Sequence, residues 1–233
     1  FEMDERDLRN RVKNKMIRPT TIPYLIEELI VEQACAREAL RLSFDQHRSL
    51  AVGLKGGQQE RTIGDVFDQT TTGESLVNLK DLNMLIGSGG VLSHAPRRQQ
   101  TAMMLIDAFL PEGITQLTVD SIFMMPQLGV LATVQEEAAL SVFERDCLIY
   151  LGTCVSPTGK VKRNEAVLDF TLTMPNGERI SKTLNGGEIN VIPLGIGETA
   201  KIHIKPKWGF DMGNGDGKEF EGEVNGGVVG VIF

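Results

Sequence analysis

One stretch constrains the fold of this chain more than any other: a short apolar run that leads directly into a cluster of glycines. Residues 82–86 are mostly apolar, and Gly87, Gly89 and Gly90 follow at once. A helix-like segment comes next, so the pattern predicts a buried strand, a turn with almost no side chains and a helix N-terminus. Strand, turn and helix in this order are typical of an α/β layer.

Such a turn is also a place where a ligand can contact the main chain. Glycine lets the backbone approach a sugar or a phosphate closely, and a helix start offers free N–H groups at the positive end of the helix dipole. In open α/β sheets, ligands bind at the carboxyl ends of the strands. The turn is therefore a candidate nucleotide site, although an ordinary tight connection between a strand and a helix has the same pattern.

The pattern of apolar residues divides the chain into three regions. We expect a helical region at 1–75, an α/β region with the glycine turn at 76–155, and an all-β module at 156–233. Within the first region, the glycine-rich part after residue 50 predicts loops with a short helix at about 63–69.

The N-terminal region predicts two helices separated by a proline. The first runs over about 4–15, and Pro19 ends it because a residue before proline is pushed out of helical geometry. Thr20 or Thr21 then caps a second, amphipathic helix that extends to about His47.

Strands and helices alternate in the middle region. We expect strands at 82–86 and 116–120, helices at 97–109 and 136–151, and a segment of mixed character at 127–133.

The last region contains short β-type runs separated by glycine-rich turns, which favours a small sandwich or partial barrel. The expected strands are 167–174, 179–184, 188–193, 200–205 and 228–233.

Charge and cysteine content narrow the possible partners and the compartment. A net charge of −7 argues against nucleic acid and against an acidic membrane surface, and no apolar run reaches the length of a membrane span. Cys35, Cys147 and Cys154 cannot all pair with one another, which favours small buried side chains in a reducing, cytoplasmic compartment.

Five segments, spread over most of the chain, resemble one known family. That family is the accessory, reactivating protein of adenosylcobalamin-dependent glutamate mutase, within the superfamily of sugar kinases, Hsp70 chaperones and actin. The resemblance implies an α/β fold with an actin-like ATPase lobe. The segments are 15–23, 86–97, 105–109, 119–126 and 226–230.

The resemblance identifies the glycine turn with the family's adenosine motif. It implies that Gly89 and Gly90 lie against the ribose and the α-phosphate of ATP or ADP, that Ser88 and Ser93 donate their hydroxyls, and that Gly87 belongs to the same site.

The family's phosphate-binding hairpins, rich in Asp and Gly, are expected N-terminal to this region. We therefore expect an incomplete actin-like lobe, with its N-terminal half absent, followed by a small all-β domain. On this view the magnesium ligands lie outside the chain. The full-length protein is then an ATPase, and this part alone is inactive.

Two further segments have both a structural and a functional interpretation. Gly129 and Ala132 resemble the superfamily's second connecting segment, where small residues let two helices cross closely at a hinge. Arg18 could reach the adenine, although a helix cap with an ion pair explains it equally well.

The run from Asp211 to Gly217 resembles a calcium-binding loop only superficially. Met212 stands at the first ligand position, and the flanking residues are of β type, so we interpret the run as a glycine-rich loop.

The leading functional hypothesis follows from the resemblance: an ATP-dependent, chaperone-like reactivating factor that acts on a B12-dependent mutase, either glutamate mutase or a related aminomutase. Two alternatives remain open, a small-molecule kinase of the same superfamily and a non-catalytic module that binds a partner. The sequence leaves the oligomeric state open.

Overall fold

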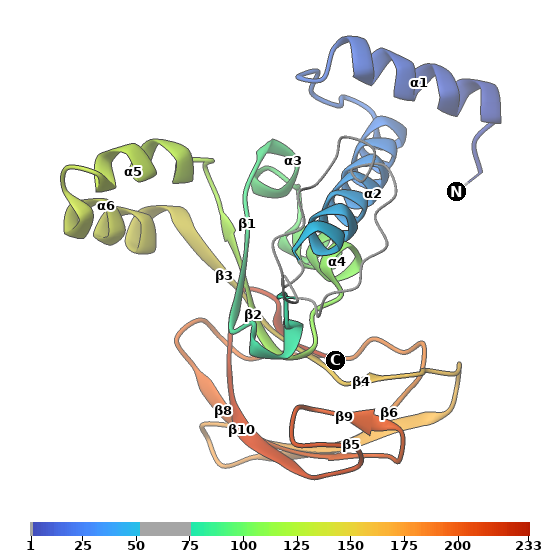
Figure 1. Cartoon of the computed structure of the whole chain (residues 1–233), viewed down its shortest axis with the longest axis vertical. Coiled ribbons are helices and arrows are strands. Elements are labelled where there is room, and N and C mark those ends of the chain that lie inside the picture. The colour runs from blue at the N-terminus through green and yellow to red at the C-terminus, as the bar shows by residue number, and fades with distance from the viewer. Residues whose placement is uncertain (1, 52–75) are drawn as a thin grey trace, which may run out of the picture.

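The computed structural model describes residues 2–51 and 76–233, which form a mixed α/β structure with open sheets. Helices and a central sheet occupy one end of the molecule, and a four-stranded sheet occupies the other (Figure 1). The expected α/β region followed by a β region is thus confirmed. The loops and short helix expected around 63–69 lie outside the described residues.

The first helix, α1 (Glu5–Ile17), is the one that the sequence predicts. The carboxylate of Asp4 caps it by accepting hydrogen bonds from the amides of Arg6 and Asp7, and the helix ends just before Pro19. An acceptor at this position satisfies amides that would otherwise lack a partner.

The second helix, α2 (Ile26–Leu50), begins later than expected, and the threonine cap is wrong. Glu28 caps it instead, because its carboxylate accepts from the amides of Tyr24 and Leu25. The Thr21 hydroxyl donates to the Arg18 carbonyl in the preceding turn. In the part of the chain that the structure describes, no helix combines the length and the apolar character needed to cross a bilayer.

The central sheet has five strands in the order β1-β2-β3-β11-β7. β1 runs parallel to β2, and β11 runs parallel to β3, while the β2–β3 and β11–β7 pairs are antiparallel. The carboxyl ends of β1 and β2 therefore meet at one edge of the sheet. The strands are β1 (Met84–Gly87), β2 (Gly113–Asp120), β3 (Leu148–Ser156), β7 (Val191–Ile192) and β11 (Gly230–Ile232).

Helix α4 (Arg98–Phe109) packs on this sheet, and α2 packs on α4 (Figure 1). Ala36 and Leu40 of α2 contact the core formed by α4 and the strands. The rings of Phe44 and Phe109 meet edge to face with centroids 5.1 Å apart. Burial of apolar side chains between these layers is the main stabilising term.

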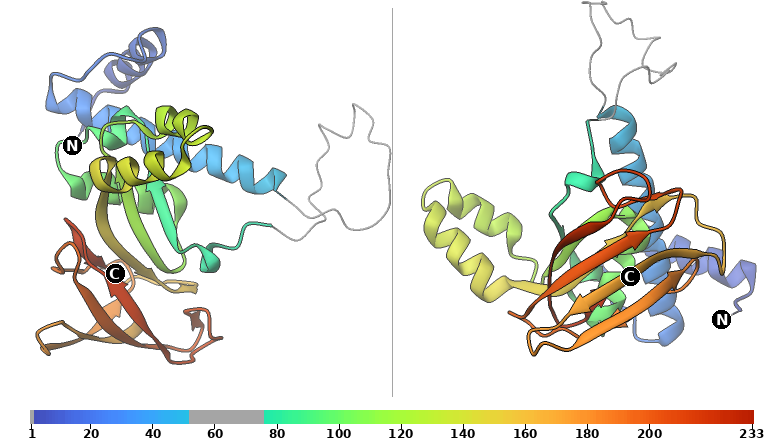
Figure 2. Two further views of the ribbon diagram at one scale, coloured as in Figure 1. Left: turned by 90° about the vertical axis from the view of Figure 1, so that its left-hand side faces the viewer. Right: turned by 90° about the horizontal axis from the view of Figure 1, so that it is seen from below.

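A helical hairpin connects β2 to β3. It consists of α5 (Met125–Ala132) and α6 (Glu136–Val142), so the segment of mixed character at 127–133 is mostly helical. The views in Figures 1 and 2 show that this hairpin stands away from α1 and α2. It has a small core of its own, made by Leu128, Ala139 and Cys147.

The helix expected at 136–151 is too long at its C-terminal end. A π-helical turn, η3 (Phe143–Cys147), follows α6, and the chain then enters β3 at Leu148. Leu148–Leu151 suits either a helix or a strand by composition, but β3 pairs with β2 and β11, and Leu151 is fully buried there. Strand pairing and burial therefore override the helical pattern that the local sequence suggests, and the segment forms a strand.

The C-terminal region forms an antiparallel sheet in the order β10-β8-β5-β6. Most expected strands are present, but β10 was not expected, and the run 188–193 is reduced to β7. β7 and the C-terminal β11 join the central sheet rather than this one. The strands are β5 (Ala166–Thr173), β6 (Arg179–Asn185), β8 (Thr199–Pro206) and β10 (Phe220–Asn225), with a small additional pair, β4 (Thr158–Gly159) and β9 (Phe210–Asp211).

The core under this sheet also includes residues of the central sheet. Val155, Val231 and Phe233 belong to the same buried cluster as Phe170 of β5. The Phe170 and Phe233 rings stack with centroids 3.9 Å apart. The C-terminus thus lies at the junction of the two sheets (Figure 1).

The loop from Asp211 to Gly217 is organised by one carboxylate. Asp211 accepts hydrogen bonds from the amides of Gly213 and Gly215, and it forms an ion pair with Lys80 of the 3-10 turn η2 (Leu79–Asp81). The ion pair joins the β region to the start of the α/β region. Hydrogen bonding to Lys80, followed by the amides, lowers the pKa of Asp211 to about 2.

This lowered pKa predicts a contribution to acid stability. Because the folded value lies below the usual 3.8, the stabilisation is complete above about pH 4 and is lost as the pH falls toward 2. We expect Asp211→Asn and Lys80→Met each to flatten the fall in unfolding free energy over this range, measured by urea denaturation at successive pH values. Variants that keep the wild-type slope would contradict the assignment.

Candidate functional site

The glycine turn lies where the sequence predicts it, at the carboxyl end of a strand, but β1 is an edge strand that is only partly buried, with Ile86 exposed. β1 ends at Gly87, which pairs with Val119 of the parallel neighbour β2. Ser88 and Gly89 then form the turn, and the single-turn helix α3 (Gly90–Ser93) follows. Gly89 has a φ of +111°, a conformation that favours glycine, so the sharp change of direction depends on this residue.

The glycines of the turn fall into two groups with different roles. A Cβ on Gly87 would lie 3.1 Å from Leu105 Cδ2 and 3.2 Å from Leu92 Cδ1, so this glycine allows the turn to pack on the core. At Gly89 and Gly90, a Cβ would meet no heavy atom of the described residues within 4 Å. These two glycines therefore present bare backbone to open space, as a ligand-contacting turn requires.

The two serines of the turn also differ. Ser93 is buried, and its hydroxyl donates to the Asp120 carbonyl over 2.5 Å, so it holds the turn against β2. Ser88 is half-buried, and its hydroxyl donates to the Asp120 carboxylate over 3.3 Å. Of the two, Ser88 has the hydroxyl that is better placed to reach a ligand.

Asp120 is the residue of this site that sequence reasoning missed. It is the last residue of β2 and is fully buried, and its carboxylate accepts from the amides of Met124 and Met125 at the start of α5. The sequence signal that could have identified Asp120 was an aspartate at the end of an apolar strand that follows the glycine turn.

The thiol of Cys147 lies near this carboxylate. Burial, then the charges of Asp120 and Asp146, raises the pKa of the Cys147 thiol.

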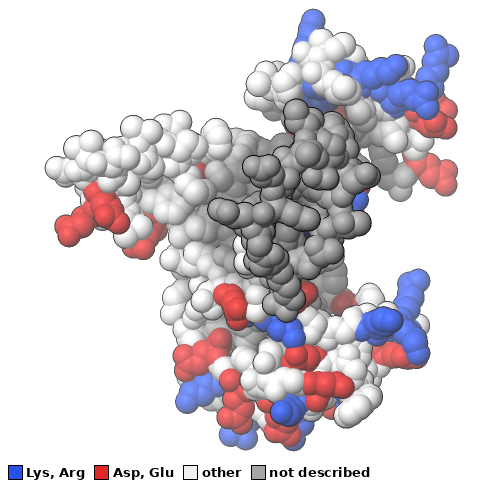
Figure 3. All heavy atoms as spheres, viewed as in Figure 1, with Lys and Arg blue, Asp and Glu red and all other residues white. Residues whose placement is uncertain are grey.

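Helix α5 and the short loop that follows it expose an apolar surface. Gly129 is exposed, a Cβ there would meet no described heavy atom within 4 Å, and Val130 and Val134 are 71% and 82% exposed. Residues 121–135 carry no charged side chain, and Figure 3 shows the hairpin as a largely uncharged projection with acidic side chains along one side. An exposed apolar surface of this kind is typical of an interaction site.

The structure does not bring Arg18 to the glycine turn. Arg18 lines a hollow of about 500 Å³ between α1 and α2, together with Lys15 and Glu32, which form an ion pair. Of the described residues that line this hollow, none belongs to the turn. The Arg18 carbonyl accepts from the amide and the hydroxyl of Thr21, so its backbone shapes the connection between the two helices.

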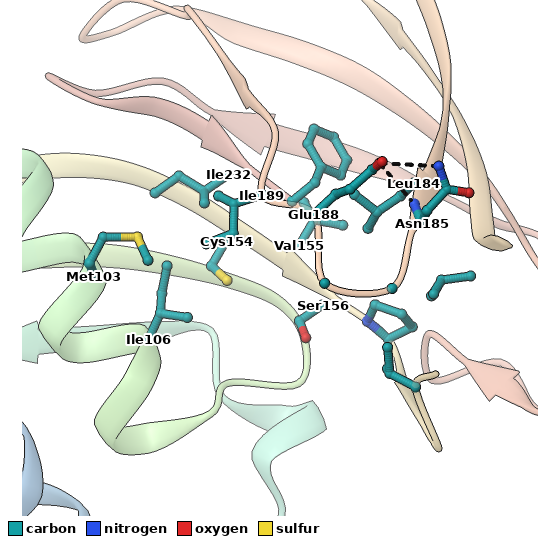
Figure 4. A pocket seen from close by; sticks show the side chains of 16 residues that line it. Met103, Ile106, Cys154, Val155, Ser156, Leu184, Asn185, Glu188, Ile189 and Ile232 are labelled. Carbon is teal, nitrogen blue, oxygen red and sulfur yellow. Dashed lines mark hydrogen bonds between the residues drawn. The ribbon is translucent and has the colours of Figure 1, made fainter. Parts of the chain in front are cut away.

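A second hollow, of about 190 Å³, lies between α4 and the β region (Figure 4). Its walls are mainly apolar, and the Glu188 carboxylate at its rim accepts from the backbone and side-chain N–H groups of Asn185. Burial raises the pKa of the Cys154 thiol in its wall to about 12. This thiol therefore stays protonated, and we assign it to packing rather than to chemistry.

Comparison with known protein families gives a match over most of the chain. The family model described as MutL protein matches residues 2–147, which include α1, α2, the glycine turn, Asp120 and the α5–α6 hairpin. Searches of curated proteins and of solved structures give no match. The matched region covers more than half of the 233 residues, and the chain therefore belongs to the MutL protein family, which is associated with glutamate mutase.

Proposed function

We propose that this protein takes part in the ATP-dependent reactivation of a B12-dependent mutase, glutamate mutase or a related aminomutase. The observation that carries the proposal is the open backbone at Gly89 and Gly90, at the carboxyl end of the parallel β1–β2 pair. Membership in a family associated with glutamate mutase supports a mutase as the partner.

In this proposal the turn holds the nucleoside part of ATP or ADP. Gly89 and Gly90 contact the ribose and the α-phosphate through their backbone, and the Ser88 hydroxyl contributes a hydrogen bond. The absence of side chains at both glycines fits a flat sugar edge, because even a Cβ would occupy that space. No residue of this chain is assigned to magnesium or to the terminal phosphates.

The α5 helix gives the proposal a mechanical component. It begins at Met125, shortly after β2 ends at Asp120, and it exposes Gly129 on an uncharged face suited to close helix packing, whereas Ala132 packs against the hairpin's own core. A nucleotide that binds better to a closed arrangement around this helix shifts the population toward that arrangement. The difference in affinity between the two arrangements is the free energy available to loosen a mutase and release damaged cobalamin.

A reactivation assay tests the proposal directly. Glutamate mutase is loaded with cyanocobalamin, which lacks the adenosyl group, and is then incubated with fresh adenosylcobalamin, ATP, magnesium and the full-length protein, because no residue of this chain is assigned to magnesium or to the terminal phosphates. We expect mutase activity to return only when both ATP and the protein are present. Recovery that is equal without ATP, or no recovery with any combination, would contradict the proposal.

The same preparation separates the two alternative functions. A small-molecule kinase would consume ATP in proportion to an added metabolite without any mutase. A module that only binds a partner would bind the mutase equally well with and without ATP. Nucleotide-dependent recovery of mutase activity is expected from neither alternative.

A further inference from the structure

Asp120 has contacts on both sides of the candidate site. On one side, its Oδ2 atom accepts from the Ser88 hydroxyl in the glycine turn, at 3.3 Å. On the other side, the same Oδ2 accepts from the Met125 amide, the first residue of α5, at 2.8 Å, while Oδ1 accepts from the Met124 amide at 3.1 Å. One buried oxygen atom thus joins the turn and the helical hairpin.

Backbone contacts of Asp120 strengthen its link to the turn. Its carbonyl accepts from the buried Ser93 hydroxyl at the end of α3, and the Ser93 carbonyl in turn accepts from the Arg98 guanidinium at the start of α4. Asp120 is fully buried, so water cannot replace a donor that leaves the carboxylate. When one donor leaves, the carboxylate therefore depends more strongly on the hydrogen bonds that remain, and breaking one of these costs more free energy.

We propose that Asp120 is a positioning residue that couples the glycine turn to the α5–α6 hairpin through the oxygen shared by Ser88 and Met125. The proposal rests on the nucleotide-binding role proposed above for the turn. A ligand that draws the Ser88 hydroxyl away leaves the Met125 amide as the chief partner of Oδ2. The start of α5 then becomes harder to open, and occupancy of the turn is transmitted to the hairpin.

Amide hydrogen exchange of Met125, measured by NMR on the whole chain without nucleotide, tests this coupling. Ser88→Ala removes only the competing hydroxyl, so we expect Met125 to exchange about two- to threefold more slowly than in the wild type. If Ser88 had only a structural role, S88A would instead speed the exchange of the Met125 amide, because loss of a stabilising contact makes local opening easier. Unchanged or faster exchange in S88A would therefore overturn the proposal.

Ser121→Ala is the matched control. The Ser121 hydroxyl donates to the Cys147 carbonyl over 2.8 Å, one residue away from Asp120 in sequence but without using the shared oxygen. Its removal should not slow Met125 exchange. Equal slowing in S121A and S88A would overturn the proposal, because the effect would then not be specific to Oδ2.

Addition of ADP gives a second readout. In the wild type we expect slower exchange both in the turn, at residues 88–93, and at Met125. In S88A, with the ADP concentration raised to saturate a site that lacks the Ser88 hydrogen bond, only the turn should respond. If ADP protects the turn of the wild type but leaves Met125 exchange unchanged, the coupling through Asp120 is overturned, while the proposed nucleotide site still stands. If ADP protects neither, the nucleotide site itself is contradicted, and the comparison of S88A with the wild type without nucleotide still decides the coupling.

Discussion

Gly90→Val should lower the affinity of this protein for ATP or ADP by about a hundredfold while leaving its stability within about 0.5 kcal/mol of the wild type. Gly90 is exposed, and a Cβ there would meet no described heavy atom within 4 Å. The valine side chain is therefore accommodated in the folded protein. It projects instead into the space proposed for the ribose, where overpacking costs about 1–3 kcal/mol.

Isothermal titration calorimetry measures the affinity, and thermal unfolding by circular dichroism measures the stability. Gly129→Val is the matched control, because Gly129 is also exposed and has equally open space around it, but it lies on α5. We expect G129V to bind nucleotide like the wild type and to fail in mutase reactivation, since it obstructs the proposed helix crossing. Equal affinities of G90V and the wild type would exclude the turn as the nucleotide site.

The glycine turn could be predicted from sequence because its signals are local. An apolar run, closely spaced glycines and a helix-forming segment specify strand, turn and helix without reference to distant residues. The same is true of α1, where Asp4 and Pro19 mark the two ends of the helix. The distinction among the glycines was not local: Gly87 differs from Gly90 only because Leu92 and Leu105 pack against it.

Features that depend on pairing between distant segments could not be predicted in this way. Asp120 looked like an ordinary aspartate after a strand, and its importance arises from contacts with Ser88, 32 residues earlier in the chain. The start of β3 looked helical until its pairing with β2 and β11 was known. The C-terminal β11 looked like part of the β module, yet its partners, β3 and β7, place it in the central sheet.

Gly152→Ala should destabilise the fold severely. Gly152 of β3 pairs with Gly230 of β11, and its φ of +138° is one that other residues rarely adopt. A Cβ at Gly152 would lie 1.8 Å from the Gly230 carbonyl oxygen, which is part of the neighbouring backbone and cannot rotate away. Gly227, which lies just before β11, must also lack a side chain, because a Cβ there would lie 2.4 Å from the Gly152 amide nitrogen.

An alanine at position 152 therefore forces β3 and β11 apart at the junction of the two sheets. We expect a loss of more than about 4 kcal/mol, seen as low soluble yield and no cooperative thermal transition by circular dichroism. Gly177→Ala separates sterics from backbone strain: Gly177 also has a positive φ, +84°, but a Cβ there meets no described atom within 4 Å. That variant should lose only about 1–2 kcal/mol, the cost of a left-handed conformation, and remain folded. A G152A protein that unfolds at the wild-type temperature would show that β3 and β11 do not pair through these glycines, and the C-terminal segment would then need a different place in the fold.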